Sequence, residues 1–259
     1  MVYETQDVNE LAIENRSSED VYVQSGDIVK GGQQDRMLAV DLIVPPHSGK
    51  LPIAAFCVES GRWTRRGSEQ AASFSSSDNV AATKEIKLAA KRSNSQGDVW
   101  KNVTMAQDKL SENVGTRVNS TVSSSSLELA VENRQVQQIT ESYMSALSGI
   151  VNGSDEVIGY VFAINGAINS ANVYASSGLF KKLWPKLVKA NAIEAIAELQ
   201  KDKRFEPTTA DHVKTFLAEV PKSSAAEKVF TTEDARNIFF ETRDLAQKGA
   251  WIHRNYIRK

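Results

Sequence analysis

Four runs of β-forming residues within the first sixty positions constrain the fold more than any other feature of the sequence. They occupy residues 11–15, 20–32, 36–46 and 50–59, and each is rich in Val, Ile, Leu or Phe. Clusters of Gly, Pro, Asn, Asp and Ser separate them, as is typical of turns. Val40, Leu42 and Val44 recur at every second position, which indicates a strand with one buried face. Such short connections predict an antiparallel β-meander over residues 11–59.

The rest of the chain predicts helices and hairpins. Apolar residues recur at helical spacing in residues 96–115, 127–147, 178–200 and 209–220. Asn165-Gly166 lies between two β-rich runs, which is typical of a two-residue type I′ hairpin. Residues 235–259 alternate around Lys248-Gly249 and predict a second hairpin.

This order of elements predicts an α+β protein whose mainly antiparallel sheet, an N-terminal meander plus later hairpins, packs with about four helices. We expect one domain over residues 1–259. Within it we expect a β-meander at 1–64, a flexible Ser- and Ala-rich excursion at 65–95, and helices and hairpins at 96–259.

The composition argues against several classes of partner. Lys and Arg total 31 against 32 Asp and Glu, so no global positive field draws nucleic acid or an anionic membrane surface. No apolar run is long enough to span a membrane. The N-terminus has neither a basic start nor an apolar segment, as in a cytoplasmic protein or a secreted protein without its signal peptide. Protein partners cannot be named from the sequence.

Signatures of common enzyme classes are missing from the sequence. It has no Walker loop, no G-x-G-x-x-G motif after a strand, and no G-x-S-x-G motif. The three histidines lie far apart, and none has a partner at helical spacing. We therefore predict no metal site and no cofactor.

The first polar constellation is GDIVKGGQQDR, residues 26–36, a turn between two predicted strands. Gln34, Asp35 and Arg36 stand at its end. Such residues usually bond to turn backbone, with Gly31 and Gly32 supplying positive φ angles. The functional alternative is a ligand-binding loop on a rigid sheet.

The second constellation is CVESGRW, residues 57–63, at the end of the last predicted strand. A lone strand cysteine is usually an inert buried residue, so we expect Cys57 to be buried. Glu59 and Arg62 either form a structural ion pair beside Trp63, or serve as a general base and an anion contact. We expect both to lie near Asp35 and Arg36, because the returning strand ends close to the first turn.

Helical spacing adds one further pair, Gln96 and Trp100, which lie one turn apart. Trp63, Trp100 and Trp184 could stack on a planar ligand, although tryptophans at this spacing more often belong to a core. We include Gln96 among the predicted ligand-binding residues, with Gln34, Asp35, Arg36, Arg62 and Trp63. Glu59 is the candidate catalytic residue.

Four stretches together resemble a bacterial family of unknown function: residues 26–36, 43–63, 96–100 and 159–187. The family is named for its genomic association with ADP-ribosylglycohydrolases and with proteins of the rhodanese/phosphatase superfamily. The resemblance covers roughly residues 8 to 195. It implies a role near NAD or ADP-ribose metabolism, which is an association rather than a mechanism.

The chain departs from the family pattern in two ways. The resemblance implies more sequence before the first shared strand, and an acid and a Phe where this chain has Asn172 and Tyr174. If that acid is catalytic in relatives, activity here is in doubt. The sequence thus predicts binding or processing of a small ADP-ribose- or NAD-related nucleotide. The alternative is a non-enzymatic protein-interaction or scaffold module.

Overall fold

The computed structural model describes residues 1–77, 83–219, 229–234, 236–244 and 249–259. It confirms the α+β class, with mostly antiparallel sheets. The chain divides into two compact units. Unit 1 comprises residues 1–144 and 189–197, and unit 2 comprises residues 145–188 and 198–259. The predicted single domain over residues 1–259 stays a prediction.

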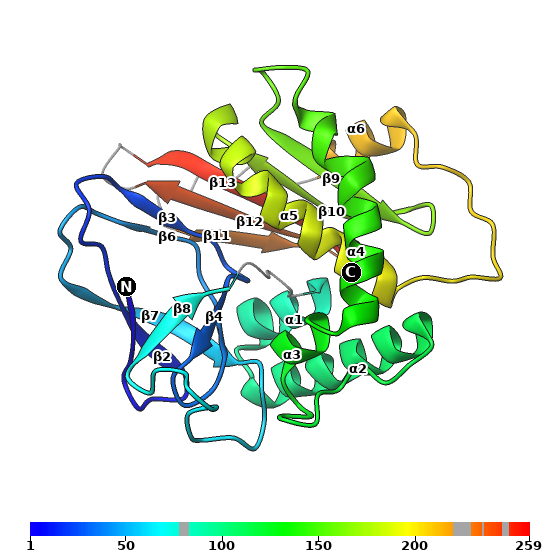
Figure 1. The fold of residues 1–259 in the computed structure, drawn as a ribbon. Coiled ribbons are helices and arrows are strands. Elements are labelled where there is room, and N and C mark those ends of the chain that lie inside the picture. The colour runs from blue at the N-terminus through cyan, green and yellow to red at the C-terminus, as the bar shows by residue number, and fades with distance from the viewer. Residues whose placement is uncertain (78–82, 220–228, 235, 245–248) are drawn as a thin grey trace. The chain divides into compact units, whose positions relative to one another are not determined.

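A closed six-stranded barrel forms the β part of unit 1 (Figure 1). Its strands pair in the order β1, β2, β7, β5, β4, β8, and every pair is antiparallel. Their bounds are Val2–Glu4 (β1), Glu10–Glu14 (β2), Ile28–Gly31 (β4), Arg36–Leu38 (β5), Lys50–Cys57 (β7) and Ser73–Ser76 (β8). Strands β3 (Val21–Val23) and β6 (Leu42–Val44) form a separate two-stranded sheet. Closure of the barrel removes the exposed edges of an open sheet.

The strand order differs from a simple meander, because the predicted strand over residues 36–46 divides into β5 and β6. Between them, Asp41 Oδ1 accepts from the Ser25 N–H at 2.6 Å, and the Ser25 hydroxyl donates to the Ala39 carbonyl at 2.9 Å. Residues 39–41 belong to neither strand, although the Ala39 N–H still donates to the Ala54 carbonyl of β7 at 2.9 Å. Strand β5 nevertheless pairs antiparallel with the end of β7, Arg36 opposite Cys57.

The described part of residues 65–95, predicted to be a flexible excursion, contains strand β8, a short α-helix and a short π-helical segment. Strand β8 pairs with both β1 and β4 and so closes the barrel. Phe74 of this strand packs against the barrel core. Helix α1 (Lys84–Leu88) follows, and Thr83 caps it by accepting from the Ile86 N–H at 3.4 Å. Phe74 is thus the apolar anchor of β8, and Ile86 anchors the helix that follows in the core of unit 1.

Helices complete unit 1. After a short π-helical segment (Ala89–Ser93), α2 runs from Gln96 to Val114 with Ser95 as its N-cap, and Gly115 ends it with φ +75°. The helix predicted over residues 127–147 is two helices, α3 (Leu127–Val131) and α4 (Arg134–Leu147). Ser126 caps α3 by accepting from the Leu129 N–H.

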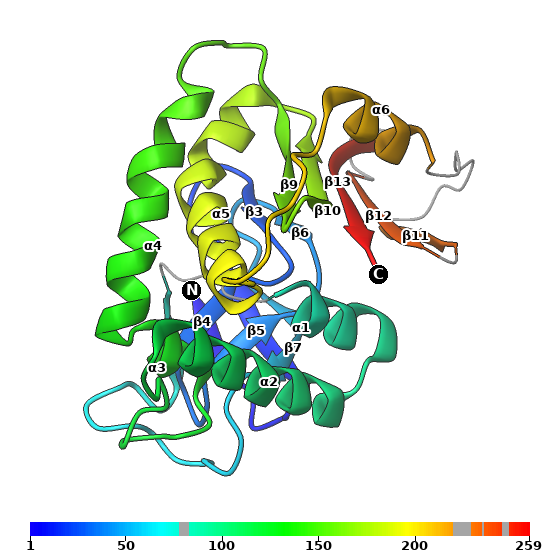
Figure 2. The same ribbon diagram turned by 90° about the vertical axis from the view of Figure 1, so that its right-hand side faces the viewer.

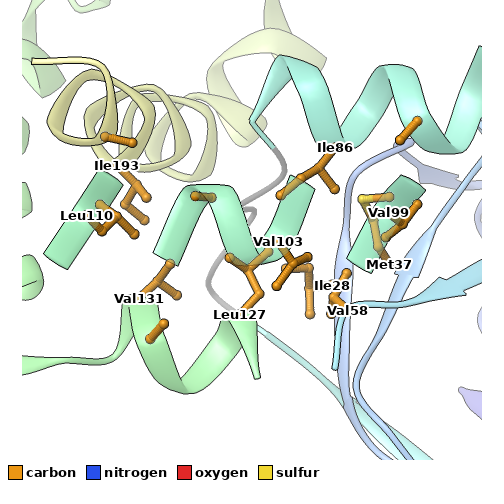
Figure 3. Close-up of a cluster of buried hydrophobic side chains, with 14 of the residues drawn as sticks. Ile28, Met37, Val58, Ile86, Val99, Val103, Leu110, Leu127, Val131 and Ile193 are labelled. Carbon is orange, nitrogen blue, oxygen red and sulfur yellow. The ribbon is translucent and has the colours of Figure 1, made fainter. Parts of the chain in front are cut away.

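The main core of unit 1 lies between the barrel and these helices. Figures 1 and 2 both place α1, α2 and α3 beside the barrel strands. The helices and the barrel contribute one continuous buried apolar cluster, shown in part in Figure 3. Its labelled members are Ile28, Met37, Val58, Ile86, Val99, Val103, Leu110, Leu127, Val131 and Ile193. Burial of these side chains holds the end of β7 against the helices, at about 25 cal/mol per Å² of apolar surface.

Unit 2 is built on a five-stranded antiparallel sheet in the order β11, β12, β13, β10, β9. The strands are Gly159–Ile164 (β9), Ala167–Tyr174 (β10), Val229–Glu233 (β11), Asn237–Asp244 (β12) and Ala250–Arg258 (β13). The strand pairing of both predicted hairpins is confirmed, since β9 pairs with β10 and β12 pairs with β13. Lys248 of the second predicted turn lies outside the described residues. Asn165 and Gly166 have φ angles of +52° and +74°, as a type I′ turn requires.

Two helices cover opposite faces of this sheet (Figure 2). The 3₁₀ segment Ser148–Val151 leads into unit 2, and helix α5 (Ser177–Ala197) begins there and ends in unit 1. On one face, Phe180 and Trp184 of α5 contact the Tyr160 ring, at centroid distances of 6.2 and 5.4 Å. On the other face, Phe216 of α6 (Ala210–Ala218) packs with Ala171. None of the described helices has the length and apolar character needed to cross a bilayer.

Candidate functional site

Pairing of β5 with β7 brings Asp35 and Glu59 together, as predicted. The Val58 N–H donates to the Asp35 carbonyl at 3.1 Å. The Asp35 N–H donates in turn to Glu59 Oε2 at 3.4 Å. Both carboxylate side chains are fully buried. The expected proximity of Glu59 and Arg62 to Asp35 is therefore confirmed.

Two arginines from the loop after β7 neutralise these carboxylates. Arg62 Nη2 lies 2.6 Å from Glu59 Oε2 and 3.8 Å from Asp35 Oδ1. Arg66 Nη2 lies 3.0 Å from Asp35 Oδ2, and its Nη1 lies 3.7 Å from Glu59 Oε1. Arg66 Nη2 also pairs with Glu69 Oε1 at 2.7 Å. We call Asp35, Glu59, Arg62, Arg66 and Glu69 the charge cluster.

The two buried carboxyls of the charge cluster have opposite pKa shifts. Burial raises the pKa of Asp35, and the charge of Glu59 adds to this rise while that of Arg66 opposes it. Burial also acts to raise the pKa of Glu59, but hydrogen bonds from Arg62 and Ser123 and the charges of Arg62 and Arg66 outweigh it, so this pKa is lowered. Glu59 is thus the stable anion, and Asp35 is the group that takes a proton more readily.

A pocket of about 980 Å³ opens beside the charge cluster, within unit 1. Its walls are the loop after β7 and the loop between α2 and α3. Four arginines line it, together with Trp63 and a run of Ser and Thr side chains. The lining residues are Ser60–Gly67, Arg117 and Asn119–Ser125. We call this the arginine pocket.

Hydrogen bonds join the two loops that form the walls. Ser125 Oγ donates to the Ser60 carbonyl at 2.6 Å and lies 3.1 Å from the Ser60 N–H, from which it accepts. At the cluster, the Ser126 hydroxyl donates to Asp35 Oδ2 at 3.3 Å. Buried Gln107 of α2 donates to the carbonyls of Ser124 and Ser126, both at 3.1 Å. The walls are therefore held in place before any ligand arrives.

The predicted residues Arg36 and Trp63 contact one another. The Arg36 guanidinium carbon lies 5.2 Å from the centre of the Trp63 ring, within cation–π range. Arg36 is fully buried, donates to the Val8 carbonyl, and has Glu4 Oε1 3.6 Å from its Nη2. Trp63 remains 41% exposed and lines the arginine pocket. Arg36 therefore supports Trp63 rather than lining the pocket itself.

Other predicted residues are engaged elsewhere. Gln96 bonds at both ends of its amide to the backbone of Cys57: Nε2 donates to the carbonyl, and Oε1 accepts from the N–H, both at 2.8 Å. Gln34 is buried and does not line the pocket. Cys57 is buried as expected, and burial raises the pKa of its thiol to about 11. Such a thiol is unreactive at neutral pH.

Asn172, where the resemblance implied an acid, lies in a buried polar cluster on the sheet of unit 2. Its Nδ2 donates to the Tyr160 hydroxyl at 2.9 Å. Its Oδ1 accepts from Asn255 Nδ2 at 3.0 Å and lies 3.0 Å from His253 Nε2. Tyr174 stacks on His253 with 4.6 Å between ring centroids. In this chain the amide thus has hydrogen-bond partners at both ends.

Sequence reasoning missed several residues that the structure brings to the site. Arg66 joins Asp35 and Glu59, while Arg65 and Arg117 line the pocket. The doublet Arg65-Arg66, separated from Trp63 by Thr64 alone, was an available signal. Arg117 lies 55 residues beyond Arg62 in the sequence and had no such signal. Among the described residues, no group of His, Cys, Asp and Glu has the arrangement of a metal site.

Comparison with known proteins identifies one family. The model of the ARG and Rhodanese-Phosphatase-superfamily-associated Protein domain matches residues 2–257. No curated protein and no solved structure matches the chain.

Proposed function

The chain belongs to the family of the ARG and Rhodanese-Phosphatase-superfamily-associated Protein domain, and we propose that it binds a phosphate-bearing, nucleotide-derived small molecule in the arginine pocket. ADP-ribose and NAD are the ligands of this class that the genomic association of the family favours. The genomic association favours these two ligands over other phosphate-bearing molecules. The chemistry of the pocket supports a phosphate-bearing ligand in general.

The observation that carries the proposal is the charge around the pocket. Arg62 and Arg66 are paired with buried carboxylates. Arg65 and Arg117 are exposed, and neither forms an ion pair within the part of the chain that the structure describes. Arginine forks match phosphate oxygens in two-pronged hydrogen bonds, and nearby Ser and Thr hydroxyls add further donors. Two unneutralised guanidinium groups in one pocket favour an anion with more than one charge.

Trp63 supports the nucleotide part of the proposal. Arg36 lies over the Trp63 ring, while 41% of the Trp63 surface remains exposed. An exposed indole in a pocket is a platform for a planar base, and stacking of this kind contributes roughly 1–3 kcal/mol. The volume of about 980 Å³ accommodates a ligand of nucleotide size.

The proposal is tested with ADP-ribose, NAD and ribose 5-phosphate, measured by thermal shift and calorimetry, with adenosine as the uncharged control. Phosphate-bearing ligands should raise the melting temperature, because a ligand that binds only the folded state stabilises it. The double variant Arg65→Gln/Arg117→Gln should bind about tenfold or more weakly. Arg134→Gln, on an exposed arginine of α4, is the matched control. Absence of any shift at millimolar ligand would contradict the proposal, as would equal affinity of the double variant.

Glu59 has two proposed roles that the same experiments separate. As a positioning residue it holds Arg62 at 2.6 Å, so Glu59→Gln should weaken both ligand binding and stability. If Glu59 is instead the predicted general base, Glu59→Gln should leave ligand binding intact and abolish turnover. The full burial of its carboxylate, and its contacts with two arginines, support the positioning role.

The protein-interaction module is the second candidate function. Exposed apolar surface at the pocket supports it, since Val122, which lines the pocket from the loop between α2 and α3, is 71% exposed. Deleting the Ser-rich residues 67–78 would not test this function separately from the fold, because the deletion removes barrel strand β8. Val122→Ser is cleaner: loss of a protein complex with unchanged ADP-ribose binding would favour the module.

A further inference from the structure

A second hollow lies wholly within unit 2. It has a volume of about 400 Å³ and lies between the start of β10, helix α6 and the end of β13. Residues 166–168 and Thr208 form one side, His212, Thr215 and Phe216 of α6 form another, and Arg258 completes it. We call it the α6 groove. It shares no residue with the arginine pocket.

The floor of the α6 groove is apolar. Phe216 is almost fully buried and packs with Ile168 in the small core of unit 2. Ala167 and the Gly166 backbone extend this surface. A ligand lying here would therefore need an apolar body, for which burial contributes about 25 cal/mol per Å².

Arg258 supplies a positive charge above this floor. Its guanidinium carbon lies 5.2 Å from the centre of the Phe216 ring. Within the described part of the chain Arg258 forms an ion pair with Glu219, whose Oε2 lies 3.8 Å from Nη2, beyond hydrogen-bond distance. That oxygen accepts instead from Asn237 Nδ2 at 3.0 Å. The N–H donors of Arg258 are thus not used by Glu219.

His212 adds a second donor. It is the third residue of α6 in a capping box, and its Nδ1 accepts from the Thr209 N–H at 3.5 Å. A neutral imidazole that accepts at Nδ1 carries its proton on Nε2. The helix cap thereby sets the tautomer and makes Nε2–H a donor.

We propose that the α6 groove binds a small organic carboxylate with an apolar or aromatic body. The planar fork of Arg258 matches a carboxylate, His212 provides a further N–H, and Phe216 and Ile168 receive the apolar part. This site is independent of the proposed nucleotide site, so either proposal can fail alone.

Benzoate is the probe, and benzyl alcohol is its uncharged counterpart of similar shape. Binding to the full chain is followed by titration in two-dimensional NMR. Benzoate should shift the amide signals of Gly166, Thr208 and Thr215 in a saturable way, and benzyl alcohol should bind at least about tenfold more weakly, because it lacks the charge-assisted bonds. Equal binding of the two compounds, or no saturable shift by benzoate, overturns the proposal. Shifts confined to the arginine pocket also overturn it.

Two variants test the residues. Arg258→Gln should weaken benzoate binding by about tenfold or more, whereas Arg134→Gln on α4 should leave it unchanged. Thr215→Trp places a ring in the groove from an exposed position, so it should prevent binding without lowering the melting temperature. Wild-type affinity in Arg258→Gln, or undiminished binding in Thr215→Trp, contradicts the assignment.

Discussion

At the scale of single residues, the charge cluster depends on two carboxylates with different surroundings. Glu59 receives a short contact from Arg62, while Asp35 shares Arg66 with Glu59 and Glu69. Buried ion pairs add little net stability, but removing one partner leaves a buried charge without compensation. A substitution in the cluster is therefore expected to destabilise the protein mainly because the charge that remains has lost its buried partner.

Glu59→Gln should destabilise the protein by about 1–3 kcal/mol, because Arg62 and Arg66 lose a buried counter-charge. Urea unfolding at neutral pH measures the change. Glu112→Gln, on an exposed position of α2, is the matched control and should stay within about 0.5 kcal/mol of wild type. Equal stability of the two variants would mean that the cluster does not contribute to the fold.

The pH dependence of this cost follows from the lowered pKa of Glu59. A carboxyl whose pKa is lower in the folded state stabilises the protein above its unfolded pKa, here near 4.5, and this stabilisation disappears as the pH falls through the folded value. The stability difference between wild type and Glu59→Gln should therefore be largest at neutral pH and shrink below about pH 4.5. Unfolding curves over a pH series measure it. A stability difference that grows on acidification would show that the pKa of Glu59 is raised, not lowered, in the folded protein.

Asp35 should behave in the opposite sense. Its pKa is raised by burial, so its contribution to stability is fully present below the unfolded pKa, and is lost as the pH rises through the folded value. Asp35→Asn should thus cost less stability at neutral pH than Glu59→Gln. Calorimetric unfolding of both variants checks the order, and the reverse order would contradict the assignment of Glu59 as the stable anion.

Gly32 tests the tight turn between β4 and β5. Its φ is +57°, and an added Cβ would lie 2.2 Å from the Phe74 ring and 2.8 Å from Glu4 Oε2. Gly32→Ala should cost the roughly 1–2 kcal/mol of a left-handed conformation plus the clash. Gly49→Ala is a matched control, with φ +63° and open space around its Cβ. Urea unfolding should show a larger loss of stability for Gly32→Ala than for Gly49→Ala. Equal losses would mean that the Phe74 ring moves aside at no cost.

At the scale of elements, Gln96 links helix α2 to strand β7. Its amide bonds both to the Cys57 N–H and to the Cys57 carbonyl, as a neighbouring strand would. Gln96, predicted to contact a ligand, therefore connects the start of α2 to the end of β7. This link lies two residues before Glu59, the charge-cluster member that follows the end of β7.

Gln96→Ala should destabilise this junction by about 1–2 kcal/mol, because two backbone groups lose their partners. Hydrogen exchange of the Cys57 amide should accelerate accordingly, by about tenfold per 1.4 kcal/mol. Gln138→Ala, on the exposed face of α4, should leave that amide unchanged. Unchanged exchange in Gln96→Ala would show that the amide is protected by other contacts.

At the scale of the whole molecule, the net charge is only −1, so the positive charge of the arginine pocket is confined to its surroundings. Long-range attraction of an anion is weak for such a chain, and screening acts mainly on the exposed Arg65 and Arg117. Arg62 and Arg66 are partly buried and already paired with carboxylates, so their contribution responds less to salt.

Affinity for ADP-ribose should consequently fall as ionic strength rises, and the Arg65→Gln/Arg117→Gln variant should show a shallower dependence on salt than wild type. Calorimetry over a salt series measures both slopes. Identical slopes would place the anion away from these two side chains.

The sequence by itself determined the local elements of this protein. Alternating apolar residues, turn residues such as Asn165-Gly166, and caps such as Gly115 act through neighbours in the chain, so their outcome is visible in the sequence. The approach of Asp35 to Glu59 also followed, because antiparallel pairing places the start of one strand beside the end of the other. Only the tertiary structure decided which strands pair, since the Ser-rich strand β8 closes the barrel by pairing with both β1 and β4. It alone also brought Arg117 to the pocket that Arg62 lines, because their proximity depends on how α2 packs against the barrel and not on spacing along the chain.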